Sequence, residues 1–214
     1  MLGTDQFPVI EVNLENANET GFFCKRRKRE SLGFRQKMDW VTKSFKNGLK
    51  IKIMNRGNHQ FGFIEYIPGE YAWRVVEAPD FMVIHCLWVI GPAKEKGIGK
   101  MLGETCMCDA RSLGKKGVVI VTTRGHWPAN KELFVQMWFE TTSRAPPSFE
   151  LLVKNWSKDQ NPVFPDDWLE RLANCPQGIT IFRSSQCPYE EDSVQAVLTV
   201  SKELGIGSKM WSLR

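Results

Sequence analysis

The chain has 214 residues, of which 42% are hydrophobic and 25% are charged, and its formal net charge is +5. This length and balance are typical of a soluble globular protein with one domain, or one domain and a short annex. The sequence has no run of 18 apolar residues and no basic start followed by an apolar stretch. We therefore expect neither a transmembrane helix nor a secretory signal, and a cytoplasmic location.

Basic residues gather in the run Lys25 to Arg29, which is capable of touching phosphate or nucleic acid. Because no recognisable nucleic-acid module accompanies it, we interpret it as a solvated helix face and expect no nucleic-acid partner. The six cysteines have irregular spacings and no Cys-x-x-Cys pair, so we expect reduced thiols and no metal site. They are Cys24, Cys86, Cys106, Cys108, Cys175 and Cys187.

The first part of the chain predicts strands and one helix. Residues 30–45 place apolar side chains at helical spacing, and residues 49–53 alternate strictly as a half-buried strand does. Short strands are also expected at 7–12 and 61–67, with a turn at 55–60 and an irregular or extended piece at 71–76.

Residues 81–90 are almost wholly apolar and predict a central strand covered on both faces. A glycine loop follows, then a helix at 100–113 that Gly114 ends, and a second buried strand at 118–121. Strand, loop, helix and strand form a right-handed βαβ unit if both strands share a sheet. The fold class is therefore α/β.

The last part of the chain predicts a helix at 130–139, a strand at 149–154, and a proline-containing linker with a short helix at 168–173. A new unit then opens with a strand at 179–182, a turn, and a helix at 190–204. Gly205 ends this helix, and we expect a short strand-turn-helix annex to which the tail 207–214 adds no further strand.

The glycine loop Lys94 to Gly99 lies between a buried strand and a helix start. Gly97 and Gly99 allow backbone N–H groups to approach a phosphate, which the helix dipole also favours. A P-loop is excluded because Met101 follows Lys100, and a dinucleotide fingerprint is disfavoured because Leu102 replaces its third glycine. A tight turn without a ligand remains the alternative.

The segment Val89 to Gly99 resembles the acetyl-CoA loop of the GNAT acyltransferase superfamily, with Lys94 in place of the usual Arg or Gln. The resemblance implies a mixed central sheet flanked by helices, and acetyl-CoA as cosubstrate. It also implies that the strand before the loop lines pantetheine and the loop holds the pyrophosphate. The implied cofactor-binding residues are Trp88, Val89, Ile90, Lys94, Glu95, Lys96, Gly97, Ile98, Gly99, Lys100 and, before a later helix, Asn130.

Residues 69–74, 84–89 and 149–154 further resemble a narrower GNAT group with a YoaP-like, thioredoxin-like C-terminal part. The implied division is an acetyltransferase domain at 1–156, a linker at 157–176 and a thioredoxin-like fragment at 177–214. Cys187 stands where thioredoxin-like folds place their nucleophilic thiol. Glu190 replaces the second cysteine, so no internal disulfide forms there.

Two carboxylates and a histidine are candidates for the base that amine acetylation needs. We name Glu65 and His85 as the candidate catalytic residues, with Glu70 as a third. A lone histidine on an apolar strand nevertheless favours a hydrogen-bonded core histidine at position 85, and a strand-edge carboxylate is an equal alternative for Glu65. Three aromatic side chains are candidates to line the acceptor pocket or to pack in the core, namely Tyr66, Tyr71 and Trp73. Phe134 stands where the family usually has the tyrosine that protonates the departing thiolate. Because phenylalanine cannot donate a proton, water or another side chain would have to serve.

The sequence therefore predicts an N-acetyltransferase that transfers an acetyl group from acetyl-CoA to a primary amine on a small molecule or peptide. Two alternatives stay open. The chain is a non-catalytic module that binds or senses acetyl-CoA, or it is a thiol redox protein that uses Cys187.

Overall fold

The computed structural model describes residues 8–57, 59–124 and 131–213. The chain forms two compact units, one from residues 1–23 and 45–164 and the other from residues 24–44 and 165–214. The chain thus enters the second unit twice. The boundaries at 156 and 176 that the resemblance implies remain a prediction.

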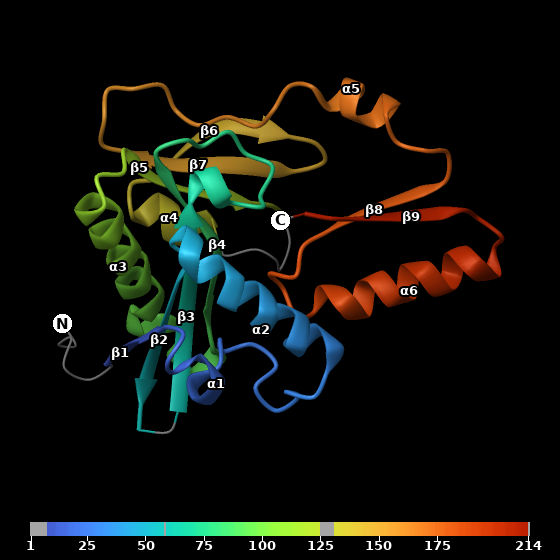
Figure 1. Cartoon of the computed structure of the whole chain (residues 1–214). Helices are drawn as coiled ribbons and strands as arrows, with labels where there is room; N and C mark the ends of the chain where they lie inside the picture. Colours follow the sequence, from blue (N-terminus) through green and yellow to red (C-terminus); the bar gives the residue numbers. More distant parts are fainter. Residues whose placement is uncertain (1–7, 58, 125–130, 214) are drawn as a thin grey trace. The chain divides into compact units, whose positions relative to one another are not determined.

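The first unit is built on a seven-stranded sheet with the strand order β1-β2-β3-β4-β5-β7-β6 (Figure 1). Its neighbouring strands are antiparallel except for β4 and β5, which are parallel. The strands are β1 (Val9–Val12), β2 (Lys50–Arg56), β3 (His59–Pro68), β4 (Phe81–Val89), β5 (Gly117–Thr122), β6 (Glu140–Ala145) and β7 (Phe149–Asn155).

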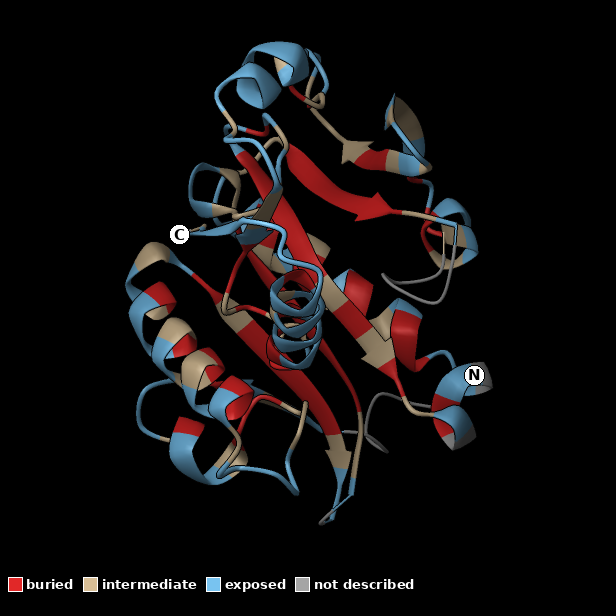
Figure 2. Cartoon of the chain, turned by 90° about the vertical axis from the view of Figure 1, so that its right-hand side faces the viewer, coloured by how far each residue is buried: buried red, intermediate tan, exposed pale blue. Residues whose placement is uncertain are grey.

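The helix α3 (Ile98–Ser112) connects β4 to β5 and packs across β3, β4 and β5. This arrangement confirms the predicted βαβ unit. The helix turns Ile98, Leu102, Cys106 and Ala110 toward the sheet at the spacing of one helical face, and all four are fully buried. On the other face of the sheet, Val83, Val119 and Leu151 form a second core under the segment that precedes β4. The central strand is therefore buried on both faces, as predicted (Figure 2).

The helix α4 (Lys131–Gln136) is shorter than the predicted helix at 130–139. The N–H groups of Trp138 and Phe139 donate to the carbonyls of Val135 and Phe134, and Trp138 has a φ of 65°. This pattern is a Schellman motif, which ends a helix with one left-handed residue. The chain then enters β6, which the sequence did not predict.

Short helical pieces also occur in the first unit, among them one α-helix and one 3-10 turn. The short helix α1 (Ala17–Thr20) follows β1, and a 3-10 turn at Gly69–Tyr71 follows β3. Within the described part of the chain, no helix combines the length and apolar character needed to cross a membrane.

The second unit contains α2 (Leu32–Ser44), α5 (Trp168–Ala173), β8 (Ile179–Arg183), α6 (Glu190–Glu203) and β9 (Ser208–Ser212). The strands β8 and β9 pair in parallel, and α6 lies between them in the chain. The expectation that the tail 207–214 adds no strand is therefore wrong. All five residues of β9 are exposed, so the alternation that marks a half-buried strand is missing from its sequence.

Packing between α2 and α6 joins the two segments of the second unit. A Cβ atom at Gly33 would collide with the carbonyl group of Pro188, so only glycine allows this approach. The buried Lys37 ammonium donates to the Gln186 carbonyl oxygen at 2.7 Å. Arg183 donates to Glu191 at 2.7 Å and to Gln36 at 2.8 Å. The helix at residues 30–45 therefore packs with the C-terminal annex, which its own sequence does not indicate.

Candidate acyl-transfer site

A fork between β4 and β5 is the central feature of the candidate site. The two strands pair from Phe81 opposite Gly117 to Ile84 opposite Ile120. Beyond this point β4 continues to Val89 and, among the described residues, pairs with β3 alone. Its edge toward β5 therefore presents backbone groups that an extended ligand is able to pair with, as an added strand does.

A β-bulge lies where the fork opens. Glu65 on β3 faces Cys86, whereas the next residue, Tyr66, faces Ile84. His85 is thus the extra residue on β4. A bulge increases local twist and redirects side chains, and such bulges are common beside active sites. Here the bulge residue His85 directly follows Ile84, the last residue of β4 that pairs with β5, so it lies at the base of the fork.

The loop after β4 leads into α3 through a left-handed glycine. Residues Gly91–Lys96 form a 3-10 helix, and Gly97 has φ 73° and ψ 3° as the N-terminal flanking residue of α3. A Cβ atom at Gly97 would meet nothing within 4 Å, so the turn is open on that side. The first N–H groups of an α-helix have no acceptor within the helix, and they point out of this turn. The loop is therefore open to an anion.

The charges around the turn match a phosphate ligand. The side chains of Lys94, Lys96 and Lys100 are exposed, and the first turn of α3 contains no acidic residue. The positive end of the helix dipole adds to their field. The Lys94 ammonium also lies 5.6 Å from the ring centre of Trp88 on β4. Predicted loop and strand residues are thus neighbours at the open end of the fork.

Gly99 has a different role from Gly97. It is buried, and a Cβ atom there would lie 3.0 Å from a methyl group of Leu133 on α4 and 3.7 Å from one of Leu87. The absence of a side chain at position 99 lets α3 approach α4 and β4 closely. Gly99 therefore sets the position of the helix start, and Gly97 sets its backbone conformation.

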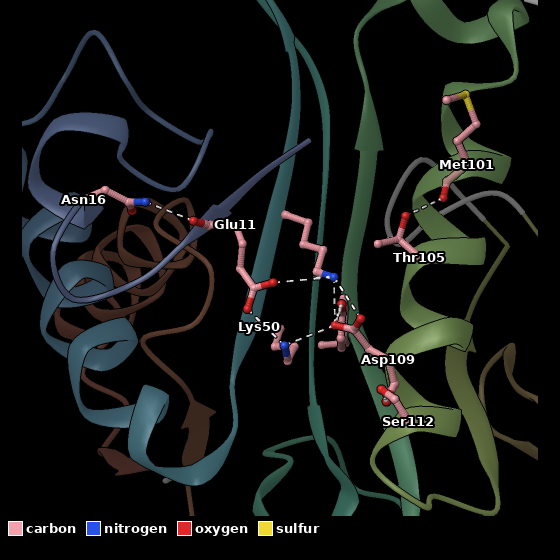
Figure 3. Close-up of polar contacts among 9 residues, drawn as sticks. Glu11, Asn16, Lys50, Met101, Thr105, Asp109 and Ser112 are labelled. Carbon is pink, nitrogen blue, oxygen red and sulfur yellow. Dashed lines mark hydrogen bonds and ion pairs between the residues drawn. The ribbon is translucent and has the colours of Figure 1, made fainter. Parts of the chain in front are cut away.

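The other end of α3 is anchored by a polar network (Figure 3). Asp109 accepts hydrogen bonds from the Tyr66 hydroxyl at 2.7 Å and from the Lys52 ammonium at 2.9 Å, and Lys50 lies 3.3 Å away. Glu11 on β1 pairs with Lys50 at 3.0 Å. Burial by itself would raise the pKa of Asp109, but the hydrogen bonds from Lys52 and Tyr66, together with the charges of Lys52 and Lys50, lower that pKa overall. The network ties α3 to β1, β2 and β3.

The two predicted catalytic residues lie together at the base of the fork. The side chains of Glu65 and His85 are fully buried, and Oε1 of Glu65 is 3.7 Å from Nδ1 of His85. Glu65 points to the face of β3 opposite to Tyr66 and shares that face with Phe63, on which Phe23 stacks with ring centres 4.9 Å apart. The separation between the carboxylate and the imidazole is longer than a hydrogen bond, so proton transfer between them would require a bridging water molecule or a small movement of the side chains.

The segment that precedes β4 contributes two further side chains that contact the bulge. The ring of Trp73 lies 6.0 Å from that of His85, and the guanidinium of Arg74 lies 4.3 Å from the Trp73 ring. Arg74 donates a hydrogen bond to the backbone carbonyl oxygen of His85 at 3.2 Å. The sequence named Trp73 as one of three aromatic candidates, but it gave no signal for Arg74.

Other candidates lie elsewhere. Glu70 accepts a hydrogen bond from the N–H of Asp80 and pairs with Lys115 at 3.1 Å, so it joins the loop before β4 to the start of β5. Tyr66 belongs to the Asp109 network, and Tyr71 is exposed. Phe134 is fully buried and packs edge-on against Phe139. Asn130 lies outside the described residues.

Cys187 lies three residues before Glu190, the first residue of α6. Burial raises the pKa of its thiol, although the N–H groups of Tyr189 and Glu190 and the charge of Lys37 act in the opposite direction. A raised pKa reduces the thiolate fraction on which redox chemistry depends. All six cysteines are free thiols. Among the described residues, no three His, Cys, Asp or Glu side chains gather as a metal site requires.

Solved structures define the class to which this fold belongs. The chain matches yncA of Salmonella typhimurium, solved with its cofactor acetyl-CoA, with a TM-score of 0.53 at 11% identity over 73% of this chain and 97% of the other. It also matches a ribosomal-protein-alanine N-acetyltransferase of Brucella melitensis with a TM-score of 0.51 at 13% identity over 69% and 99% of the two chains. The fold is that of the GNAT acetyltransferases.

A curated relative is similar along most of the sequence. The chain is 28% identical over 201 residues to the uncharacterized N-acetyltransferase YoaP of Bacillus subtilis (strain 168). The matched region covers 92% of this chain and 79% of the relative. No protein-family model matches the sequence. The GNAT fold implied by the glycine loop is thus confirmed, and the roles of individual residues remain predictions.

Proposed function

We propose that the chain is an N-acetyltransferase that uses acetyl-CoA to acetylate a primary amine. The fork between β4 and β5, which opens at the bulge of His85 and ends at the lysine-lined start of α3, is the observation that carries the proposal. The similarity to YoaP and the acetyl-CoA-bound structure of yncA, which shares the fold, support the same cosubstrate.

The ligand fits this site in three parts. The free edge at the end of β4, at Trp88 and Val89, together with Ile90 just beyond the strand, would pair with the amide groups of pantetheine. The N–H groups at the start of α3, with Lys94, Lys96 and Lys100, would bind the pyrophosphate. The thioester would then lie at the base of the fork, next to Glu65 and His85.

Direct attack requires a neutral amine, because a protonated nitrogen has no lone pair. The Glu65 and His85 pair would accept one proton from the amine, directly or through a water molecule. The nitrogen forms a bond with the thioester carbon, the carbon–sulfur bond breaks, and CoA leaves as a thiolate. Phe134 has no hydroxyl group, so the thiolate would take its proton from water.

The test has a binding arm and a turnover arm. Acetyl-CoA should raise the thermal unfolding midpoint, because a ligand that binds only the folded state stabilises it. A panel of amines should release free thiol from acetyl-CoA. E65Q should lower kcat by roughly 100-fold or more, the usual contribution of a general base, with little effect on acetyl-CoA binding. No thermal shift with acetyl-CoA would refute the proposal.

Phe134 favours a second function, in which the chain binds acetyl-CoA without turning it over. That function predicts the same thermal shift but no thiol release with any amine. The two arms together therefore separate an enzyme from a sensor.

A further inference from the structure

The indole nitrogen of Trp73 is a buried hydrogen-bond donor that has no acceptor among the described residues. Buried polar groups in native proteins are nearly always paired, so each exception calls for an explanation. A donor of this kind is satisfied if a ligand brings an oxygen atom to it.

Trp73 lies beside the candidate catalytic pair. Its ring is 6.0 Å from the ring of His85, which is 3.7 Å from Glu65 measured between Nδ1 and Oε1. The guanidinium of Arg74 lies 4.3 Å from the Trp73 ring and holds the carbonyl of His85. A proton-accepting pair, a donor that needs an oxygen and a positive charge thus lie in one neighbourhood.

We propose that the acceptor substrate is an α-amino acid. Its amine would face Glu65 and His85, and its carboxylate would accept the Trp73 N–H in the field of Arg74. The inference rests on the proposed acetyl transfer and adds the substrate class to it. An α-amino acid has its amine and its carboxylate on one carbon, so a single small molecule reaches both groups. A polyamine has no oxygen for the indole, and the charge of Arg74 repels it.

The experiment compares three probes that differ only beside the amine. They are L-phenylalanine, L-phenylalaninamide and phenethylamine. Leucine and isoamylamine form a second pair with and without a carboxylate, and spermidine represents the polyamines. Thiol release from acetyl-CoA is measured over a range of probe concentrations. We expect the amino acids to have the highest kcat/KM and the amines without a carboxylate to have the lowest.

Two tryptophan variants identify the interaction. W73F keeps an aromatic ring and removes the N–H group. It should lower kcat/KM for the amino acids by about tenfold or more, as loss of a hydrogen bond to a charged group does, with unchanged values for phenethylamine and for acetyl-CoA. The thermal midpoint should not fall, because the lost donor has no acceptor in the part of the chain that the structure describes.

W156F is the matched control, because the indole of Trp156 already donates to the Lys115 carbonyl oxygen at 2.8 Å. It should lower the thermal midpoint and leave the ranking of the probes unchanged. A purely structural role of Trp73 would make W73F behave in the same way.

The outcomes separate this inference from the proposed function. If spermidine, the amide or phenethylamine is the best probe, acetyl transfer holds and the amino-acid inference is overturned. If no probe releases thiol, acetyl transfer fails, and binding alone tests the inference. The amino acids should then raise the thermal midpoint of the CoA-bound wild-type protein by more than they raise that of CoA-bound W73F. Equal shifts, or none, overturn the inference.

Discussion

Replacing Asp109 with asparagine tests whether the network at the far end of α3 holds this helix on the sheet. Asp109 accepts hydrogen bonds from Lys52 and Tyr66 and lies near Lys50 (Figure 3). Its side chain is 19% exposed, so water screens these contacts only partly. A hydrogen bond to a charged group contributes about 1.5–3 kcal/mol, and the amide oxygen keeps one neutral hydrogen bond. We therefore expect D109N to lower the free energy of unfolding by about 2–3 kcal/mol at pH 7.

The pH dependence provides a sharper test. The folded pKa of Asp109 lies below its unfolded value, which is about 3.9. The stabilisation by this carboxylate is therefore complete above the unfolded pKa and is lost as the pH falls through the folded pKa. The difference between wild type and D109N should shrink in that window, because wild-type Asp109 then becomes neutral as well.

Urea denaturation at a series of pH values measures this difference. D80N is the matched control, since Asp80 pairs with Lys116 at 3.0 Å but its side chain is 57% exposed. Asparagine also tolerates the left-handed conformation of Asp80, so no strain is added. We expect no measurable effect of D80N. An equal loss in both variants, or a D109N difference that stays constant down to acidic pH, would contradict the reasoning.

Four further substitutions test other features. G97A and G114A each add a Cβ atom at a left-handed glycine with open space around it, so each should lower the free energy of unfolding by about 1–2 kcal/mol. Only G97A should also weaken acetyl-CoA binding, measured by a thermal-shift titration. W138G replaces a left-handed tryptophan that is 78% exposed with glycine, which adopts this conformation without strain. It should raise the free energy of unfolding, measured by urea denaturation, by about 0.5–1 kcal/mol. A lower free energy of unfolding would show that the tryptophan packs favourably. G33A should loosen α2 from α6 and speed proteolysis within residues 165–213, and unchanged cleavage would refute the close approach of Gly33 to Pro188.

The parts of the site that depend on local sequence were predictable. A buried strand, a glycine loop and an amphipathic helix follow one another in the chain, so their patterns specify the proposed phosphate-binding loop without tertiary information. The inward orientation of Glu65 was also predictable, because it lies among alternating apolar residues of β3.

The rest of the site depends on contacts between distant segments. The bulge at His85 is a mismatch between β3 and β4, which neither strand shows alone. Arg74 belongs to an irregular segment whose position is set by the strand that follows it. The strand β6 escaped prediction because its sequence, ETTSRA, has no apolar alternation and it forms the sheet edge.

The double passage of the chain through its second unit has a consequence for how the protein can be shortened. A chain ending at residue 156 would retain α2 but lose Gln186 and Pro188, against which Lys37 and Gly33 are packed. The remaining α2 would expose Lys37, which is buried in the complete second unit, and the surface around Gly33 that packs against Pro188. Deleting the C-terminal segment alone would therefore destabilise the chain that remains. An isolated acetyltransferase unit would also require removal of residues 24–44.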